Sequence, residues 1–150
     1  MVNTETGEGF DAGRASPGVG EVMRVWTIGG KVYMGSYTEG IITEFDPEKP
    51  VGYPENPRIV ATPEHSMRPM GAADDGACLY SAATHHYGQH GFELTCYNTQ
   101  TGEAKFIDDP IPNQQMLSLF YNKKHRVLVG QPATTVMRSV RPWWIRTAMW

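Results

Sequence analysis

A weak internal repeat constrains the fold of this chain more than any other feature of its sequence. Gly35, Ser81 and Gly130 each end a short run of strand-forming residues, and they follow one another at intervals of 46 and 49 residues. The segment NTETGE at residues 3–8 returns as NTQTGE at residues 98–103, which is 95 residues later and matches the two intervals together. Repeats of about 40 to 50 residues that consist of strands are typical of β-propeller blades. The sequence therefore predicts an all-β fold.

Runs rich in β-branched and aromatic residues predict two complete four-stranded antiparallel blades and part of a third. Tight turns are expected at Gly29-Gly30 and Asp75-Gly76, because these residues tolerate the positive φ of hairpin turns. The predicted strands are residues 21–28, 31–37, 41–46 and 57–62 in the first blade and 67–73, 77–83, 91–98 and 103–107 in the second. Gly35 is expected to superpose on Ser81. The third blade has predicted strands at 116–121 and 125–131, and residues 1–13 are expected to end a preceding blade.

The length of the chain predicts an incomplete ring. A propeller closes with about four to eight blades, whereas this chain provides about two and a half. We therefore expect a partial β-propeller at residues 1–134, with exposed strand edges that favour self-association or require the remaining blades. A trimer would supply about seven blades. The isolated chain is not expected to be a simple compact monomer.

Residues 135–150 are predicted to be a basic, aromatic tail outside the repeat. They contain three arginines and three tryptophans and show neither a turn nor a blade motif. Three interpretations remain open: the end of a truncated or frame-disturbed coding sequence, a segment that folds back over the open blade edge, or an anchor for a membrane surface.

Three segments give the repeat a resemblance to known propellers. They are GKVYMGSY at residues 30–37, Phe45-Asp46-Pro47, and the stretch from Tyr97 to Glu103 that contains a Thr-Gly-Glu turn. On these segments, residues 1–131 resemble bacterial repeat propellers of the quinoprotein-like and gluconolactonase-like kind. The resemblance implies four-stranded blades but no particular activity, because propellers include enzymes, sugar-binding proteins and interaction platforms.

Composition and charge restrict the partners that we expect. The net charge of −3 argues against nucleic-acid binding, which needs a basic face to neutralise phosphates. No run approaches the roughly 18 apolar residues of a membrane span, and the N-terminal residues lack the pattern of a secretory signal. A cytoplasmic location is the default expectation.

The two cysteines are predicted to lie opposite one another on adjacent strands. If the hairpin between them turns near Tyr87, then Cys78 faces Cys96. Such a pair could form a disulfide, whereas a reducing cytosol favours two buried thiols.

The candidate binding residues lie in loops that the resemblance places on one rim of the propeller. Connections between blades, and those between the second and third strands of a blade, share that rim in such proteins. The expected ligand-binding residues are Glu64, His65, Arg68, Tyr87, Gln114 and Gln115. Arg68 could hold a carboxylate ligand or form an ordinary salt bridge at the rim.

Histidines cluster in the loop at residues 84–90. His85, His86 and His90 could bind a divalent transition metal, with His65 or Gln114 completing the coordination shell. Some polysaccharide-cleaving propellers, which this chain resembles in its repeat, hold a metal with several histidines and a glutamine. A solvated hairpin tip explains the same composition without a metal.

Two classes of function therefore remain open. The working hypothesis is a non-catalytic β-propeller module that binds a small molecule, a carbohydrate or a protein, with no cofactor required. The alternative is a metal-assisted lyase or hydrolase acting on a polysaccharide, which would use the four histidines named above. The sequence identifies no catalytic residue.

Overall fold

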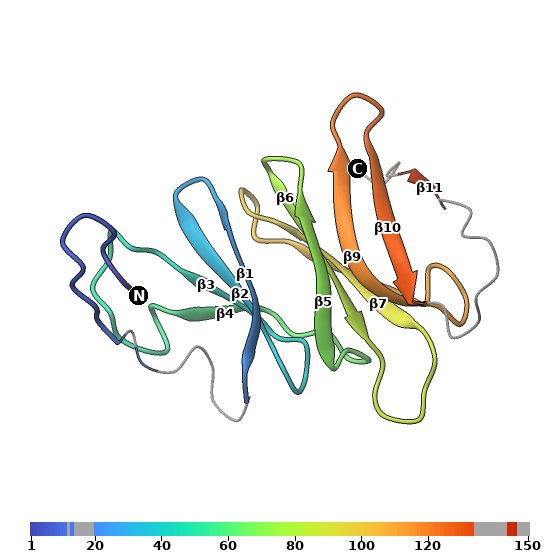
Figure 1. Cartoon of the computed structure of the whole chain (residues 1–150), viewed down its shortest axis with the longest axis horizontal. Helices are drawn as coiled ribbons and strands as arrows, with labels where there is room; N and C mark the ends of the chain where they lie inside the picture. Colours follow the sequence, from blue (N-terminus) through green and yellow to red (C-terminus); the bar gives the residue numbers. More distant parts are fainter. Residues whose placement is uncertain (12, 14–19, 134–143, 147–150) are drawn as a thin grey trace.

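The described residues form an all-β structure, as the sequence predicts. The computed structural model describes residues 1–11, 13, 20–133 and 144–146. Within these residues the chain forms eleven β-strands and no helix, so no described helix is long and apolar enough to cross a membrane (Figure 1). The strands build three antiparallel sheets, two of four strands and one of three.

Consecutive strands pair within each sheet, and all ten predicted strands are present with ends within two residues of the predicted ones. Sheet 1 consists of β1 (Val22–Ile28), β2 (Lys31–Ser36), β3 (Ile42–Phe45) and β4 (Arg58–Ala61). Sheet 2 consists of β5 (Arg68–Asp74), β6 (Cys78–Thr84), β7 (Phe92–Asn98) and β8 (Ala104–Asp108). Sheet 3 consists of β9 (Gln115–Asn122), β10 (Val127–Ala133) and β11 (Trp144–Arg146).

Strand β11 comes from the segment that the sequence assigned to a tail outside the repeat. It pairs antiparallel with Val127–Val129 of β10 and gives sheet 3 its third strand. This pairing has the form of the second interpretation, in which the tail folds back over an open strand edge. The other residues of 135–150 lie outside the described part of the chain.

The first strand of each sheet carries the same irregularity. In β1, β5 and β9 the pairing register shifts around one extra residue, which is a β-bulge. The extra residues are Met23, Met70 and Leu117, each 47 residues after the one before. Counted from the bulges, Gly35 corresponds to Ala82, because Gly35 pairs with Arg24 and Ala82 with Gly71. The predicted match of Gly35 to Ser81 is thus wrong by one residue.

Both copies of the NTxTGE motif fold into the same turn. The N–H of Asn3 donates to the carbonyl of Glu8, and the Asn3 side-chain oxygen accepts from the N–H groups of the second and third residues after it. Asn98 and Glu103 form the same set of bonds. The glycine of each copy has a positive φ, 75° in the first and 76° in the second. In sheet 2 this turn joins β7 to β8.

Sheet 2 lies between the other two sheets and is covered on both faces (Figure 1). Toward sheet 3, buried Tyr80 and Leu94 pack with Met116 and Leu128. Toward sheet 1, the buried side chains are those of Leu79, Tyr97, Tyr33 and Ile42. The described sheets form an open row rather than a closed ring.

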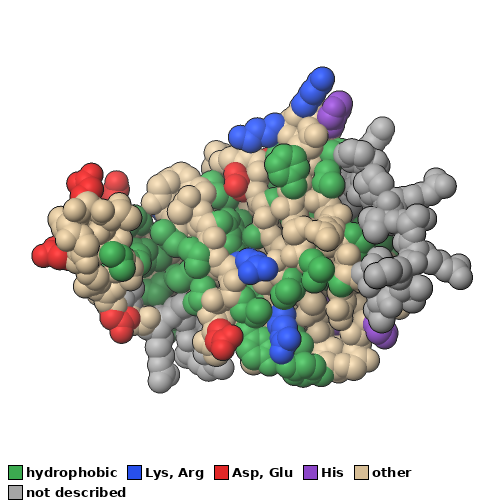
Figure 2. All heavy atoms as spheres, viewed as in Figure 1, with side chains coloured by type: hydrophobic (Ala, Val, Ile, Leu, Met, Phe, Trp, Pro, Cys, Tyr) green, Lys and Arg blue, Asp and Glu red, His purple; other side chains and the backbone are tan. Residues whose placement is uncertain are grey.

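Sheet 1 contains a buried carboxylate with two cationic partners. Glu44 accepts hydrogen bonds from Lys31 Nζ at 3.0 Å, from Arg58 Nε at 2.9 Å and from the Tyr33 hydroxyl at 2.9 Å. Burial acts to raise the pKa of Glu44, but these hydrogen bonds together outweigh burial and lower it. Figure 2 shows other acidic side chains gathered at the end of the molecule that carries the N-terminal turn.

The cysteines lie on paired strands but not opposite one another. Cys78 pairs with Asn98, and Cys96 pairs with Tyr80, so the two are diagonal neighbours. The predicted register is wrong by two residues, because the hairpin turns one residue later than Tyr87. Both thiols are free and buried. Burial raises the pKa of Cys96 to about 12.

Candidate functional site at the loop end of the sheets

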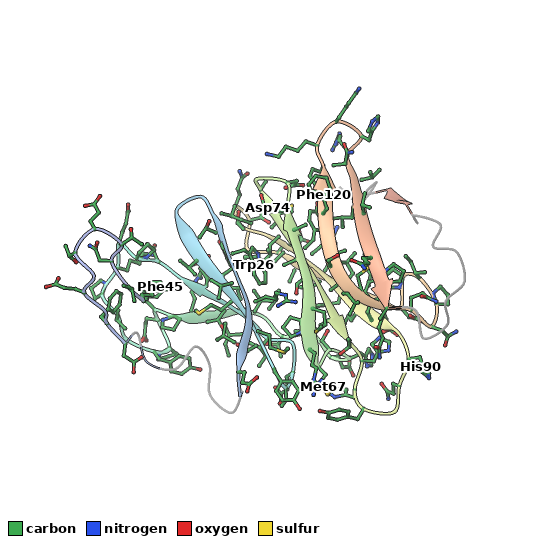
Figure 3. All side chains as sticks on the ribbon, in the orientation of Figure 1. Trp26, Phe45, Met67, Asp74, His90 and Phe120 are labelled. Carbon is green, nitrogen blue, oxygen red and sulfur yellow. The ribbon has the colours of Figure 1, made fainter. Side chains whose placement is uncertain are left out.

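Four connections meet at one end of the sheets. They join β2 to β3, β4 to β5, β6 to β7 and β8 to β9, at residues 37–41, 62–67, 85–91 and 109–114. Met67 and His90 mark this end in Figure 3, and Asp74 lies toward the other. The rings of His65 and His85, from two of these connections, lie 6.4 Å apart. The structure thus brings together loops that the sequence placed on one rim.

Arg68 lies against two tyrosine rings at this end. Its Cζ is 5.0 Å from the ring centroid of Tyr37 and 5.3 Å from that of Tyr87. Its Nη2 donates a hydrogen bond to the Tyr87 hydroxyl, and the two tyrosine hydroxyls lie 3.1 Å apart. Tyr37 follows β2, Arg68 begins β5 and Tyr87 follows β6, so these residues, called the Tyr–Arg–Tyr cluster, link sheets 1 and 2.

The cluster carries a positive charge, and the nearby carboxylate of Glu21 acts to raise the pKa of Tyr37 against the larger lowering by Tyr87 and Arg68. The ion pairs of the described residues do not include Arg68, so the expected alternative of a rim salt bridge is not found there. Its hydrogen bond with Tyr37 and its attraction to Tyr87 raise the pKa of Arg68. Hydrogen bonds from Tyr87 and Arg68 lower the pKa of Tyr37. Because Tyr87 is 71% exposed, the cluster is open to solvent.

A buried carboxylate fixes the connection that precedes Arg68. Glu93, which is 2% exposed, accepts hydrogen bonds from the N–H of His65 at 3.0 Å and from the hydroxyl of Ser66 at 2.9 Å. Gly40 packs directly against Ser66, and any Cβ at this glycine would collide with it. The β2–β3 and β4–β5 connections are therefore held together beside the cluster, which limits the positions that Arg68 and Tyr37 can take.

His85 has a structural environment. Its side chain is buried, with Nδ1 3.1 Å from the carbonyl oxygen of His90 and Nε2 2.9 Å from Asp108 Oδ1. His86 and His90 are exposed. No group of three or more histidine, cysteine, aspartate or glutamate side chains is placed to hold a metal ion in the described part of the chain. The structure thus does not gather the predicted metal ligands, with or without His65.

The remaining predicted binding residues do not join the cluster. Glu64 is exposed, Gln115 is the half-buried first residue of β9, and Gln114 is held through its backbone N–H, which donates to the carbonyl of Ile111. None of the three makes a hydrogen bond or ion pair with the Tyr–Arg–Tyr cluster.

Sequence reasoning missed two residues of the site. Neither Tyr37 nor Glu93 is among the binding residues that the sequence predicts. Glu93 did carry a signal, because it is the one charged residue of its strand, and a buried charge requires partners. Tyr37 carried none, because its contact with Arg68 depends on how two sheets pack.

Comparisons with known proteins leave the family open. The chain matches no model of a protein family and no curated protein. Its function therefore has to be inferred from its own residues.

Proposed function

We propose that this chain is part of a β-propeller and is a non-catalytic module that binds acidic carbohydrate at the loop end of its sheets. The observation that carries this proposal is the Tyr–Arg–Tyr cluster, a solvent-open guanidinium with no described carboxylate partner that lies against two aromatic rings.

Three features support the propeller architecture. The bulges recur at equal spacing in the first strand of each sheet, and these first strands are neighbours, β1 with β5 and β5 with β9. Residues 1–10 contain a second copy of the turn that joins β7 to β8 in sheet 2, and this copy is the expected end of a preceding blade. The resemblance to quinoprotein-like and gluconolactonase-like propellers is part of this proposal.

The chemistry of the cluster favours a carboxylate-bearing sugar. A guanidinium presents several N–H donors in a plane and binds a carboxylate through two parallel hydrogen bonds. Two phenol hydroxyls occupy part of this donor set but supply no full negative charge. The exposed face of Tyr87 offers an apolar surface on which the C–H groups of a sugar ring can pack. A uronic acid has both parts, a carboxylate and an apolar ring face.

Calorimetric titration with trigalacturonate tests the proposal, with the neutral galactose trimer as a second probe. We expect the wild-type chain to bind the acidic trimer and not the neutral one. Arg68→Ala should weaken binding by at least about tenfold, since a charge-assisted pair is lost. Arg68→Lys should restore only part of the affinity, because an ammonium lacks the planar fork. Higher salt should weaken binding by the wild type.

Lys124→Ala provides the matched control. This residue also carries a positive charge and is exposed, but it lies in the β9–β10 turn, away from the cluster (Figure 1). Its removal should leave the affinity unchanged. Circular dichroism would establish that the Arg68 variants remain folded. Equal affinity of folded Arg68→Ala and wild type, or no binding of the acidic trimer by wild type, would contradict the proposal.

A further inference from the structure

The outward face of sheet 3 is the one that points away from sheet 2. It is equivalent to the face of sheet 1 that packs against sheet 2 and to the face of sheet 2 that packs against sheet 3. Counted from the bulges, Trp26, Ala73 and Phe120 occupy equivalent positions in the first strands. Trp26 packs against the core between sheets 1 and 2, and Ala73 packs against the core between sheets 2 and 3. Phe120 lies between Leu119 and Tyr121, which face sheet 2, and therefore points away from it. Its side chain is 64% exposed.

The outward face of sheet 1 shows the complementary arrangement. Val25, Ala72 and Leu119 are the equivalent positions one residue earlier. Leu119 packs against the preceding sheet, and Ala72 lies on the side of sheet 2 that faces sheet 1. Val25 has no preceding sheet among the described residues and is 61% exposed. Each end of the row of sheets thus presents one half of a contact that occurs twice within it.

We infer that a second copy of this chain covers these faces, with sheet 1 of one copy packed against sheet 3 of the other. A second copy suits the faces because one chain carries both halves of the contact, and the outward residues Val25 and Phe120 are uncharged. Both faces expose apolar side chains to water, and a second copy would bury them. The inference concerns the sheet faces and is independent of ligand binding at the loop end.

The contacts inside the chain show how the faces meet. First strands approach closely, since a Cβ at Gly71 of β5 would lie 2.9 Å from the carbonyl carbon of Ser118 in β9. A hydrogen bond also joins neighbouring first strands, from Arg24 Nε to the carbonyl of Met70 at 2.7 Å. Phe45 on the outward face of sheet 1 is already buried, so the contact between copies centres on β1 and β9.

Such a contact joins two different surfaces and is head-to-tail. Each copy that is added leaves one face of each kind exposed until a ring closes. This property separates it from a symmetric dimer, in which the same surface of both copies meets itself. It also provides a sharp test, because a variant that lacks one half of the contact still carries the other.

Sedimentation equilibrium over a wide range of concentrations tests the inference. We expect wild type to associate with increasing concentration, whereas Val25→Asp and Phe120→Asp should each weaken association by at least about tenfold. An equimolar mixture of the two variants should form a heterodimer, since each supplies the half that the other lacks. Gln100→Asp, which introduces the same charge in the exposed β7–β8 turn, should associate like wild type.

Several results would overturn the inference. These are a wild-type chain that stays monomeric at high micromolar concentration, folded variants that associate like wild type, or a mixture that remains monomeric. A monomeric wild type would mean that something other than a second copy covers the faces. If aspartate prevents folding at either position, threonine there makes the side chain more polar and keeps strand propensity, and the same outcomes apply.

Discussion

Sheets 1 and 2 have the same topology but differ in how their strands are buried. Every residue of β6 in sheet 2 is buried, whereas its counterpart β2 in sheet 1 contains three buried and three partly buried residues. The difference follows from position, since among the described residues sheet 2 has a neighbouring sheet on each face and sheet 1 has a neighbouring sheet on one face. The comparison teaches that a second neighbouring sheet increases the burial of equivalent strands, although β3 of sheet 1 is fully buried as well.

Truncation of core side chains should give the largest contrast between the two sheets. Leu94 is fully buried in sheet 2, and Ile59, on the outward face of sheet 1, is 38% exposed. Leu94→Ala should lower the free energy of unfolding by about 2–5 kcal/mol because it leaves a cavity. Ile59→Ala should lower it by about 1 kcal/mol or less. Urea denaturation at low protein concentration measures both, and equal losses would refute the comparison.

Acid sensitivity should distinguish buried Glu44 of sheet 1 from partly buried Asp75 in the β5–β6 turn of sheet 2. Asp75 accepts hydrogen bonds from the N–H groups of Ala77 and Cys78 and from the Tyr80 hydroxyl. Burial acts to raise its pKa, but these donors together lower it. Glu44 in sheet 1 also has a lowered pKa, but two of its three partners are cations.

A lowered pKa in the folded state adds stability above the ordinary pKa of the carboxyl group, and this stability is lost as the pH falls through the folded value. For Glu44 the loss should begin near its ordinary pKa of 4.5. Glu44→Gln should lower the free energy of unfolding by about 1–2 kcal/mol at neutral pH and reduce its decline in acid. Salt should weaken the wild-type contribution of Glu44, since its cations are partly exposed, and leave that of Asp75 nearly unchanged. Thermal unfolding across pH and salt checks this, and an identical acid response of wild type and Glu44→Gln would count against it.

The repeated turn offers the smallest and most closely matched contrast. Gly102 and Gly7 have nearly identical positive φ values, and no atom lies within 4 Å of where a Cβ would be. Gly102→Ala should lower the free energy of unfolding by about 1 kcal/mol through backbone strain, because its turn joins β7 to β8 of the core sheet. Gly7→Ala should leave the main unfolding transition unchanged, since residues 1–10 belong to none of the three sheets. Equal shifts in the urea midpoint would show that the N-terminal turn unfolds with the sheets.

Local chemistry explains what the sequence could predict. Strand and turn signals depend on neighbouring residues, and Gly29-Gly30 sets the tight β1–β2 hairpin by adopting positive φ at both positions. The cysteine register failed because it depends on the conformation of a longer loop. In that loop Gly88 and Gly91 both have positive φ, and the pair Thr84 with Phe92 is the last one before the loop.

Features that depend on contacts between sheets were beyond sequence reasoning. No residue type in the sequence marks the bulge at Met70. The carbonyl of Met70 nevertheless accepts the hydrogen bond that Arg24 donates from sheet 1. Arg68 and Tyr87 were singled out because they lie near predicted loops, whereas Tyr37 joins them only through packing of sheet 1 on sheet 2. The structure does not gather the predicted metal ligands for a similar reason, because His85 is buried beside Asp108 while its neighbours in the loop stay in solvent.

The two free thiols make the seam between sheets 2 and 3 observable without an added label. Cys78 and Cys96 both belong to the core cluster that Met116 and Leu128 complete from sheet 3. A thiol reagent reaches these buried sulfur atoms when the two sheets separate or when the chain unfolds. The alkylation rate of the unmodified protein under native conditions therefore reports how often the interface between sheets 2 and 3 opens.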